Sequence, residues 1–134
     1  MYNVGPVLLQ PLVDSGAILD ICREQIAPYY RDKAAKACDL LIQELRGIPF
    51  RIHRPEGAFF LWLWFPELPV TSAALYQQLK AAGVVVLSGH YFFPGLAGDW
   101  AHMHQCLRIS YALDDEIVAQ GIRLLAREIR ALHA

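Results

Sequence analysis

The stretch from Ala58 to Phe65 reads AFFLWLWF and decides the fold more than any other part of the chain. Aromatic and branched apolar residues occupy both of its alternating sets of positions, a pattern that is typical of a strand buried on both faces. A turn at residues 55–57 precedes the stretch and Pro66 ends it. We therefore predict a central strand over residues 58–65, with aromatic side chains that belong to a hydrophobic core in preference to a ligand pocket.

Other segments supply the remaining strands of the predicted sheet. Apolar runs predict strands at residues 50–53, 84–87 and 106–111. Helical patterns around them complete the order helix, strand, strand, helix, strand, loop, strand, helix, whereas residues 1–12 look extended or loop-like. We predict an α/β domain in which helices pack on a mixed sheet.

The first helix is expected to be long and kinked. It should begin at a cap formed by Asp14 or Ser15 and end near residue 46. Pro28 lies inside it, and proline in a helix interior costs about 3 kcal/mol, so we expect a kink or a break there.

Two more helices follow the predicted central strand. Thr71 or Ser72 is expected to cap the first of them, and Asp114 the second. The apolar residues of the last helix recur at helical spacing, which predicts one buried face. This face contains Ile117, Val118, Ile122, Leu125, Ile129 and Leu132.

Composition narrows the functional classes. Apolar residues make up 55% of the 134 residues, which indicates that another chain or further sequence covers some apolar surface. The net charge is −1 and the basic residues are scattered, so nucleic acid is not an expected partner. The uncharged run at residues 57–65 is too short to cross a membrane. The three separated cysteines and the absence of a signal-peptide pattern favour the cytoplasm.

Arg108 is the most informative single residue, because it interrupts an apolar strand pattern. A guanidinium stays ionised in proteins, and burying it unpaired costs roughly several kcal/mol. Its planar fork suits a carboxylate, which can come from this chain or from a ligand. Taken on the residues alone, an internal salt bridge is slightly favoured over a ligand contact.

Other reactive side chains give weaker signals. His102, His104 and Cys106 would share one strand face, with His90 as a fourth ligand, but their spacing is not that of a zinc finger and no metal is expected. No nucleophile motif is present in the sequence. The lysines lie at polar helix positions and are expected to be solvated; they are Lys33, Lys36 and Lys80. The aperiodic segment 88–104, rich in aromatic residues, is predicted to be an ordered functional loop.

Four motifs in order point to a family. They are PEGAFFLW at residues 55–62, AGV at 82–84, GHYFFPG at 89–95 and LRISY at 107–111. Together they resemble the C-terminal small domain of fold-type-I aminotransferases, which use pyridoxal 5′-phosphate (PLP). The resemblance implies a small domain over residues 47–134, and a linking helix with the tail of a large domain over residues 1–46.

The resemblance also implies an activity and a site. Arg108 would bind the α-carboxylate of amino-acid and 2-oxo-acid substrates, and a loop carrying Gly89, His90, Phe92 and Phe93 would enclose them. The motifs are most similar to a branch that moves an amino group between valine and pyruvate, giving 3-methyl-2-oxobutanoate and alanine. Such enzymes are typically homodimers whose large domain forms most of the interface.

The same resemblance limits what this chain is expected to do alone. The lysine that holds PLP would lie before the region that corresponds to Met1, and none of the three lysines here has a matching context. This chain alone is therefore expected to be inactive. The alternative is a non-catalytic domain of the same fold that binds a carboxylate or another protein.

Overall fold

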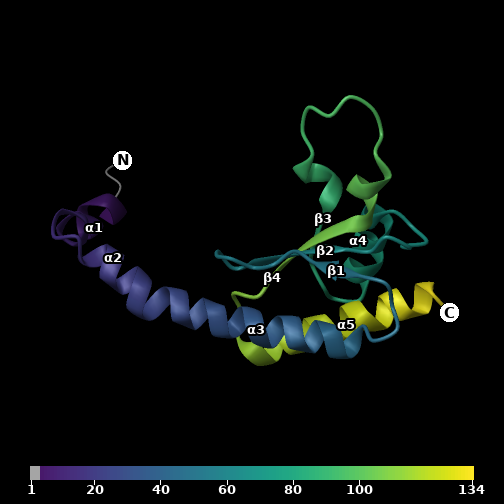
Figure 1. The fold of residues 1–134 in the computed structure, drawn as a ribbon, viewed down its shortest axis with the longest axis horizontal. Helices are drawn as coiled ribbons and strands as arrows, with labels where there is room; N and C mark the ends of the chain where they lie inside the picture. The colour runs from purple at the N-terminus through teal and green to yellow at the C-terminus, as the bar shows by residue number, and fades with distance from the viewer. Residues whose placement is uncertain (1–3) are drawn as a thin grey trace.

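The computed structural model describes residues 4–134, and it confirms the expected order of helices and strands with one helix added at the N-terminal side (Figure 1). The elements are α1 (Val4–Asp14), α2 (Ala17–Ile21), the π-helical turn η1 (Cys22–Ile26), α3 (Ala27–Glu44), β1 (Arg51–Ile52), β2 (Phe60–Trp64), α4 (Ser72–Ala81), β3 (Leu87–Ser88), the 3-10 helices η2 (Gly89–Phe92) and η3 (Ala101–Gln105), β4 (Cys106–Ser110) and α5 (Asp115–Leu132).

The strands form one sheet in the order β1-β2-β4-β3. Each neighbouring pair is antiparallel, so the prediction of a mixed sheet is wrong for the described residues. The reason is that the segment between β3 and β4 folds back on itself, as does the turn between β1 and β2, and these returns reverse the strand direction. In the central pair, Trp62 lies opposite Arg108 and Leu63 opposite Leu107.

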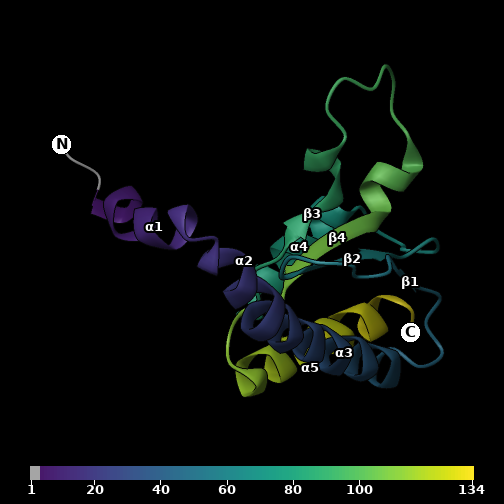
Figure 2. The ribbon, with the colours of Figure 1, turned by 60° about the vertical axis from the view of Figure 1, so that its left-hand side comes forward.

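Helices α3 and α5 lie side by side beneath one face of the sheet (Figures 1 and 2). The core fills this interface, and from β2 it receives Leu61 and Leu63, which are buried, whereas Trp62 and Trp64 are half-buried. The prediction that β2 is buried on both faces is therefore wrong. Because helices cover only one face, the alternate side chains of β2 point to the opposite side, where the loop between β3 and β4 lies.

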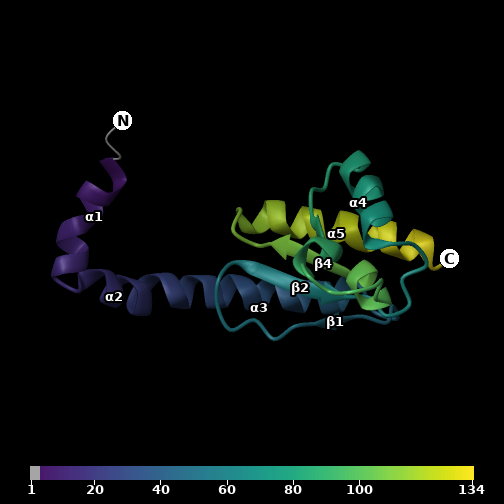
Figure 3. The same ribbon diagram turned by 90° about the horizontal axis from the view of Figure 1, so that it is seen from above.

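Residues 4–14 form a helix, α1, where the sequence suggested an extended segment. The break between helices lies at Gly16, whose φ of +74° is a left-handed conformation that suits glycine. The helical segment 17–44 is inclined by 91° to α1 (Figure 3). Gly16 occupies the N-cap position, so neither Asp14 nor Ser15 is the cap that the sequence predicted.

Pro28 does not break the helix. It is the second residue of α3, a helix that continues directly from the π-helical turn η1. This π-helical turn lies just before the proline, so the departure from α-helical geometry falls where the sequence predicted a kink or a break. The predicted kink is thus replaced by a local change of helix type.

The N-terminal helices expose much apolar surface. No residue of α1 or α2 is buried. Their exposed apolar side chains include Val4, Val7, Leu8, Leu9, Val13 and Leu19. Within residues 4–134, no single helix is both long and apolar enough to cross a membrane; by length and composition alone, only the bent pair of α1 with residues 17–44 meets that requirement.

Several local predictions can be compared with the structure. The side-chain oxygen of Thr71 accepts a hydrogen bond from the N–H of Ala74, which confirms it as a cap. Asp114 occupies the N-cap position of α5 without a capping hydrogen bond.

Strand β3 begins only at Leu87, because residues 84–86 do not pair with β4. Ile117 is 52% exposed rather than buried, because its side chain lines an open apolar cavity beside the sheet.

Lys33 is not the solvated lysine that the sequence suggested. Its side chain is 6% exposed, and its Nζ donates to Oδ1 of Asp115 at 2.6 Å and to the carbonyl oxygen of Leu113 at 2.7 Å. Lys36 adds a second ion pair to Asp115, at 3.1 Å. These contacts join α3 to the start of α5, so the first carboxylate of α5 serves the packing of two helices.

Asp115→Asn is expected to reduce the stability of the chain in a pH-dependent way. The hydrogen bond from Lys33, followed by that from Lys36, holds the pKa of Asp115 below its ordinary value of 3.8. A lowered folded-state pKa contributes stability above pH 3.8 that is lost as the pH falls through the folded-state pKa. The hydrogen bond to Asp115 raises the pKa of Lys33 above 10.5, so the partner's contribution is lost only above that pH.

Urea unfolding of both forms between pH 2 and pH 8 measures this difference. The gap between the wild-type chain and Asp115→Asn should be constant near neutrality and should close in acid, below about pH 4. Asp99→Asn is a control, because Asp99 lies in the exposed loop and pairs with His104. A gap for Asp115→Asn that does not change with pH would contradict the assignment.

Candidate functional site

Arg108 lies in the middle of β4, on the face of the sheet opposite α3 and α5. Its cross-strand neighbours are Trp62 of β2 and Leu87 of β3, and its side chain is half-buried. The guanidinium carbon lies 4.1 Å from the ring centre of Phe60 and 4.7 Å from that of Phe92. The cation therefore lies between two aromatic rings.

Within the described part of the chain, no acidic side chain pairs with this cation. Among residues 4–134, the ion pairs within 4.0 Å do not include Arg108, and none of its side-chain N–H groups donates to a protein acceptor. The internal salt bridge that the residues alone slightly favoured is therefore absent from the described part of the chain. The strand neighbours of Arg108, Trp62 and Leu87, are aromatic and apolar, and Glu56, which lines the same pocket, makes no ion pair with it.

A pocket of about 280 Å³ opens beside Arg108. The turn before β2 forms one wall, and the outward face of β2 forms the other. The lining residues are His53, Arg54, Pro55, Glu56, Gly57, Phe60, Leu61, Trp62 and Arg108. The pocket thus combines the Arg108 guanidinium with the aromatic side chains of Phe60 and Trp62, and its turn side adds polar groups; such a site suits a small carboxylate that carries an apolar group.

The loop after β3 supplies more aromatic side chains to this face. The ring of Phe92 meets Trp62 edge-on at 5.3 Å between ring centres, and Phe93 lies 6.0 Å from Trp62. Phe93 in turn contacts Trp100 and His102. The structure therefore brings Phe92 and Phe93, both predicted site residues, to the same face as Arg108.

Gly89 and His90, the other predicted site residues, make their contacts elsewhere. Gly89 is buried, and a Cβ there would lie 2.5 Å from the Cβ of Cys106 and 2.8 Å from its carbonyl oxygen. His90 Nδ1 lies 2.7 Å from the hydroxyl oxygen of Ser88. That hydroxyl is also hydrogen-bonded to the hydroxyl of Ser72 in α4. These two residues hold the start of the loop against the sheet and α4.

Phe60 and Trp62 are site residues that sequence reasoning missed. Both were assigned to the core because the whole run from 58 to 65 is apolar. A usable signal was present, since residues of equal parity in β2 share one face, and that face lies opposite Arg108 once the two strands pair. The missing information was the register between β2 and β4.

The histidine and cysteine cluster does not resemble a metal centre. Within residues 4–134, no three His, Cys, Asp or Glu side chains converge in a way that could hold a metal ion. His102 Nε2 lies 3.5 Å from the Sγ of Cys106, and His104 pairs with Asp99. Burial raises the pKa of the Cys106 thiol to about 11, which disfavours the thiolate that would bind a metal.

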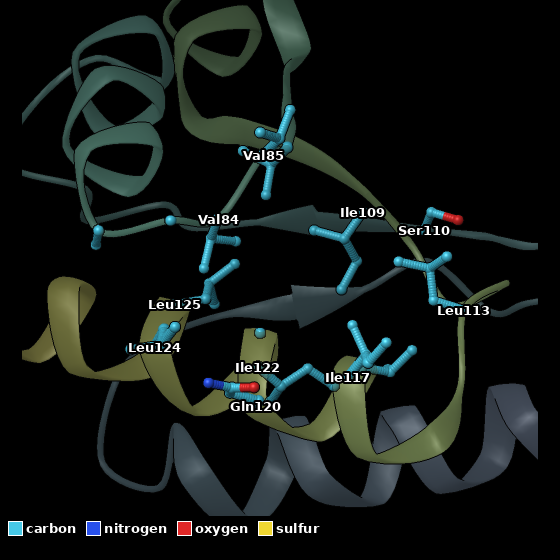
Figure 4. Close-up of a pocket in the computed structure, with 15 residues that line it drawn as sticks. Val84, Val85, Ile109, Ser110, Leu113, Ile117, Gln120, Ile122, Leu124 and Leu125 are labelled. Atoms are coloured by element: carbon cyan, nitrogen blue, oxygen red, sulfur yellow. The ribbon is translucent and has the colours of Figure 1, made fainter.

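A larger apolar groove of about 500 Å³ lies on the α5 side of the sheet, at the edge next to β3 (Figure 4). Val84 and Val85 line it from the segment before β3, and Ile117 and Leu113 line it from the α5 side. None of its lining residues carries a charge. Ile109 faces this groove from β4, next in sequence to Arg108, which faces the other side of the sheet, so the two cavities are separate.

Comparison with known proteins identifies relatives of this chain. The family model described as aminotransferase class I and II matches residues 2–125. Valine–pyruvate aminotransferase of Escherichia coli (strain K12) is 40% identical over 127 residues, which cover 95% of this chain and 30% of that protein. The 2-aminoadipate transaminase of Thermus thermophilus is 31% identical over 112 residues, which cover 83% of this chain and 26% of that protein.

A solved structure agrees with these matches. The crystal structure of valine–pyruvate aminotransferase from Salmonella typhimurium LT2 superposes with a TM-score of 0.89 at 39% identity, over 96% of this chain and 33% of that chain. The chain therefore spans about a third of the length of the relatives that it matches. The resemblance inferred from the four sequence motifs is confirmed.

Proposed function

This chain belongs to the class I and II aminotransferase family, and from that membership we propose that it is the substrate-recognition domain of a transaminase acting on valine and pyruvate. The products would be 3-methyl-2-oxobutanoate and alanine. The observation that carries the proposal is the Arg108 guanidinium, which faces a pocket and has no acidic partner among residues 4–134. The 40% identity with the valine–pyruvate enzyme of Escherichia coli supports the choice of substrates.

In this proposal Arg108 binds the α-carboxylate of the substrate. Two parallel N–H groups of a guanidinium match the two oxygens of a carboxylate, so the contact fixes the orientation of the substrate as well as its charge. The aromatic side chains of Phe92 and Phe93 enclose the apolar part of the substrate and exclude water. Excluding water strengthens the contact between the guanidinium and the carboxylate.

The family uses PLP, which accepts and returns the amino group when it is bound to the complete enzyme. The residues of this chain do not fit a covalent PLP site. Lys33 is held by Asp115 with a raised pKa, which is the wrong direction for a nucleophilic amine, and Lys36 is also paired with Asp115. Lys80 lies on α4, and it does not line the pocket at Arg108. We propose that the lysine that binds PLP belongs to the part of the relatives that this chain does not span.

The domain organisation follows the same reasoning. We propose that residues 47–134 form the small domain and that residues 1–46 lead into a large domain, which would also form most of a homodimer interface. The exposed apolar side chains of α1 and α2 support this proposal, because they require a covering surface. The widely separated cysteines, none of them in a disulfide, support a cytoplasmic enzyme.

The proposal is tested with the polypeptide encoded by the whole reading frame around this chain. Purified with PLP, it should form alanine from pyruvate with valine as the donor. It should use valine more efficiently than 2-aminoadipate, the substrate class named for the Thermus thermophilus relative. A preference for 2-aminoadipate would move the protein to that branch. No transfer with any amino donor would leave the non-catalytic carboxylate-binding domain as the better description.

A further inference from the structure

Within residues 4–134, the guanidinium of Arg108 makes no ion pair with an acidic side chain, and two aromatic rings face it. Its carbon atom lies over the ring of Phe60 at 4.1 Å and over the ring of Phe92 at 4.7 Å. We infer that Phe60 and Phe92 form an aromatic clamp that preforms the carboxylate-binding fork, and that Phe60 is a positioning residue. The inference rests on the proposed function in one respect, which is that the ligand of Arg108 is a carboxylate.

Aromatic rings are suited to this task because of where they attract the cation. A ring face attracts the charge through its quadrupole, and it leaves the N–H groups in the guanidinium plane free of protein acceptors. An aspartate or glutamate would hold the charge equally well but would occupy the same N–H groups that a substrate needs. The clamp therefore combines a fixed cation with available donors.

The two rings of the clamp are supported differently. Phe60 belongs to β2, pairs with Ser110 of β4, and is the diagonal neighbour of Arg108 on the same face. Its position is thus set by the sheet. Phe92 lies at the end of the short helix η2 and is 39% exposed. Trp62 braces it edge-on, and Trp62 is itself the direct cross-strand partner of Arg108.

This arrangement has a consequence for binding. A long arginine side chain loses considerable rotamer freedom when it is held in one geometry, and this loss opposes binding if it occurs only when the ligand arrives. With Phe60 and Phe92 in place, much of that ordering has already taken place in the free protein. Removing one ring should therefore weaken carboxylate binding even though neither ring touches a carboxylate through a polar group.

The first test observes the clamp in the 134-residue chain without any ligand. The Nε–Hε signal of Arg108, identified by its loss in Arg108→Lys, should be shifted upfield by the ring currents. Phe60→Leu should move the signal towards the value of a solvated arginine, whereas Phe60→Tyr should retain it. Phe50→Leu is the matched control, because Phe50 is also a partly buried phenylalanine but stacks on Phe65 of the hydrophobic core. A signal in Phe60→Leu that equals the wild-type signal would overturn the clamp.

The second test measures binding of 3-methyl-2-oxobutanoate to the same chain and variants. Phe60→Leu and the more exposed Phe92→Leu should each raise the Kd about 2- to 5-fold, the size of a partly solvated cation–π contact. Phe60→Tyr and Phe50→Leu should stay within about 2-fold of the wild type. An unchanged Kd in Phe60→Leu would remove its positioning role. If the wild-type chain does not bind the oxo acid, the proposed carboxylate function fails, while the Nε–Hε signals still decide the clamp.

Discussion

Arg108→Ala is expected to lower kcat/KM of the full-length enzyme about 30- to 5,000-fold for both valine and pyruvate. This corresponds to a loss of roughly 2–5 kcal/mol of transition-state stabilisation. The physical reason is that the substrate carboxylate would enter a partly aromatic pocket without the guanidinium that pairs with it. Lysine cannot replace the arginine fully, because a single ammonium group does not make two parallel hydrogen bonds. Arg108→Lys should therefore recover only part of the loss.

Steady-state kinetics with each substrate measures this effect, and the absorption spectrum of bound PLP shows whether the cofactor site is intact. The matched control is Arg123→Ala, because Arg123 lies on α5, is 62% exposed and pairs with Glu44 on the other side of the sheet. It should leave kcat/KM within about 2-fold. Equal kcat/KM values for the wild type and Arg108→Ala would show that another group binds the carboxylate.

Phe65→Ala is expected to destabilise the 134-residue chain by about 3–5 kcal/mol. The ring of Phe65 is 0% exposed and stacks on Phe50 with 6.0 Å between ring centres. Its removal leaves a cavity at the end of β2, where the backbone N–H of Phe65 also donates to the carbonyl oxygen of Gln105. The loss should therefore loosen the connection between β2 and the segment that leads into β4.

Urea unfolding followed by circular dichroism gives this difference as a lower midpoint with an unchanged slope. Tyr91→Ala is the matched control, because Tyr91 is an aromatic residue that is 69% exposed. It should change the free energy of unfolding by less than about 1 kcal/mol. A loss below about 1 kcal/mol for Phe65→Ala would mean that the end of β2 lies outside the cooperative core.

The order of elements and the family could both be predicted from the sequence. Pro66 and Gly83 mark where elements end, Thr71 caps α4 as expected, and the apolar pattern of residues 106–111 identified β4. These features act within a few residues of the chain, so local rules describe them. The family motifs are also short segments, and the match over residues 2–125 agrees with them.

The helical break could not be placed by the same rules. Pro28 is a strong local signal, yet a π-helical turn absorbs it, and the chain bends at Gly16 instead. The energy of a proline depends on which carbonyl group it faces, and a small change of helix type alters that. In the same way, the burial of Lys33 depends on an aspartate 82 residues later in the sequence.

The sequence by itself determined that Arg108 would interrupt an apolar strand and need an anion, because charge and hydropathy belong to each residue. Only the tertiary structure showed that no acidic side chain within residues 4–134 pairs with Arg108. The β2–β4 register places Trp62 opposite Arg108 and Phe60 diagonal to it, while α3 and α5 cover the other face. Which face is covered, and which side chains meet across strands, are properties of pairs of segments distant in sequence. The unpaired guanidinium between two rings therefore became visible only after the strands were aligned.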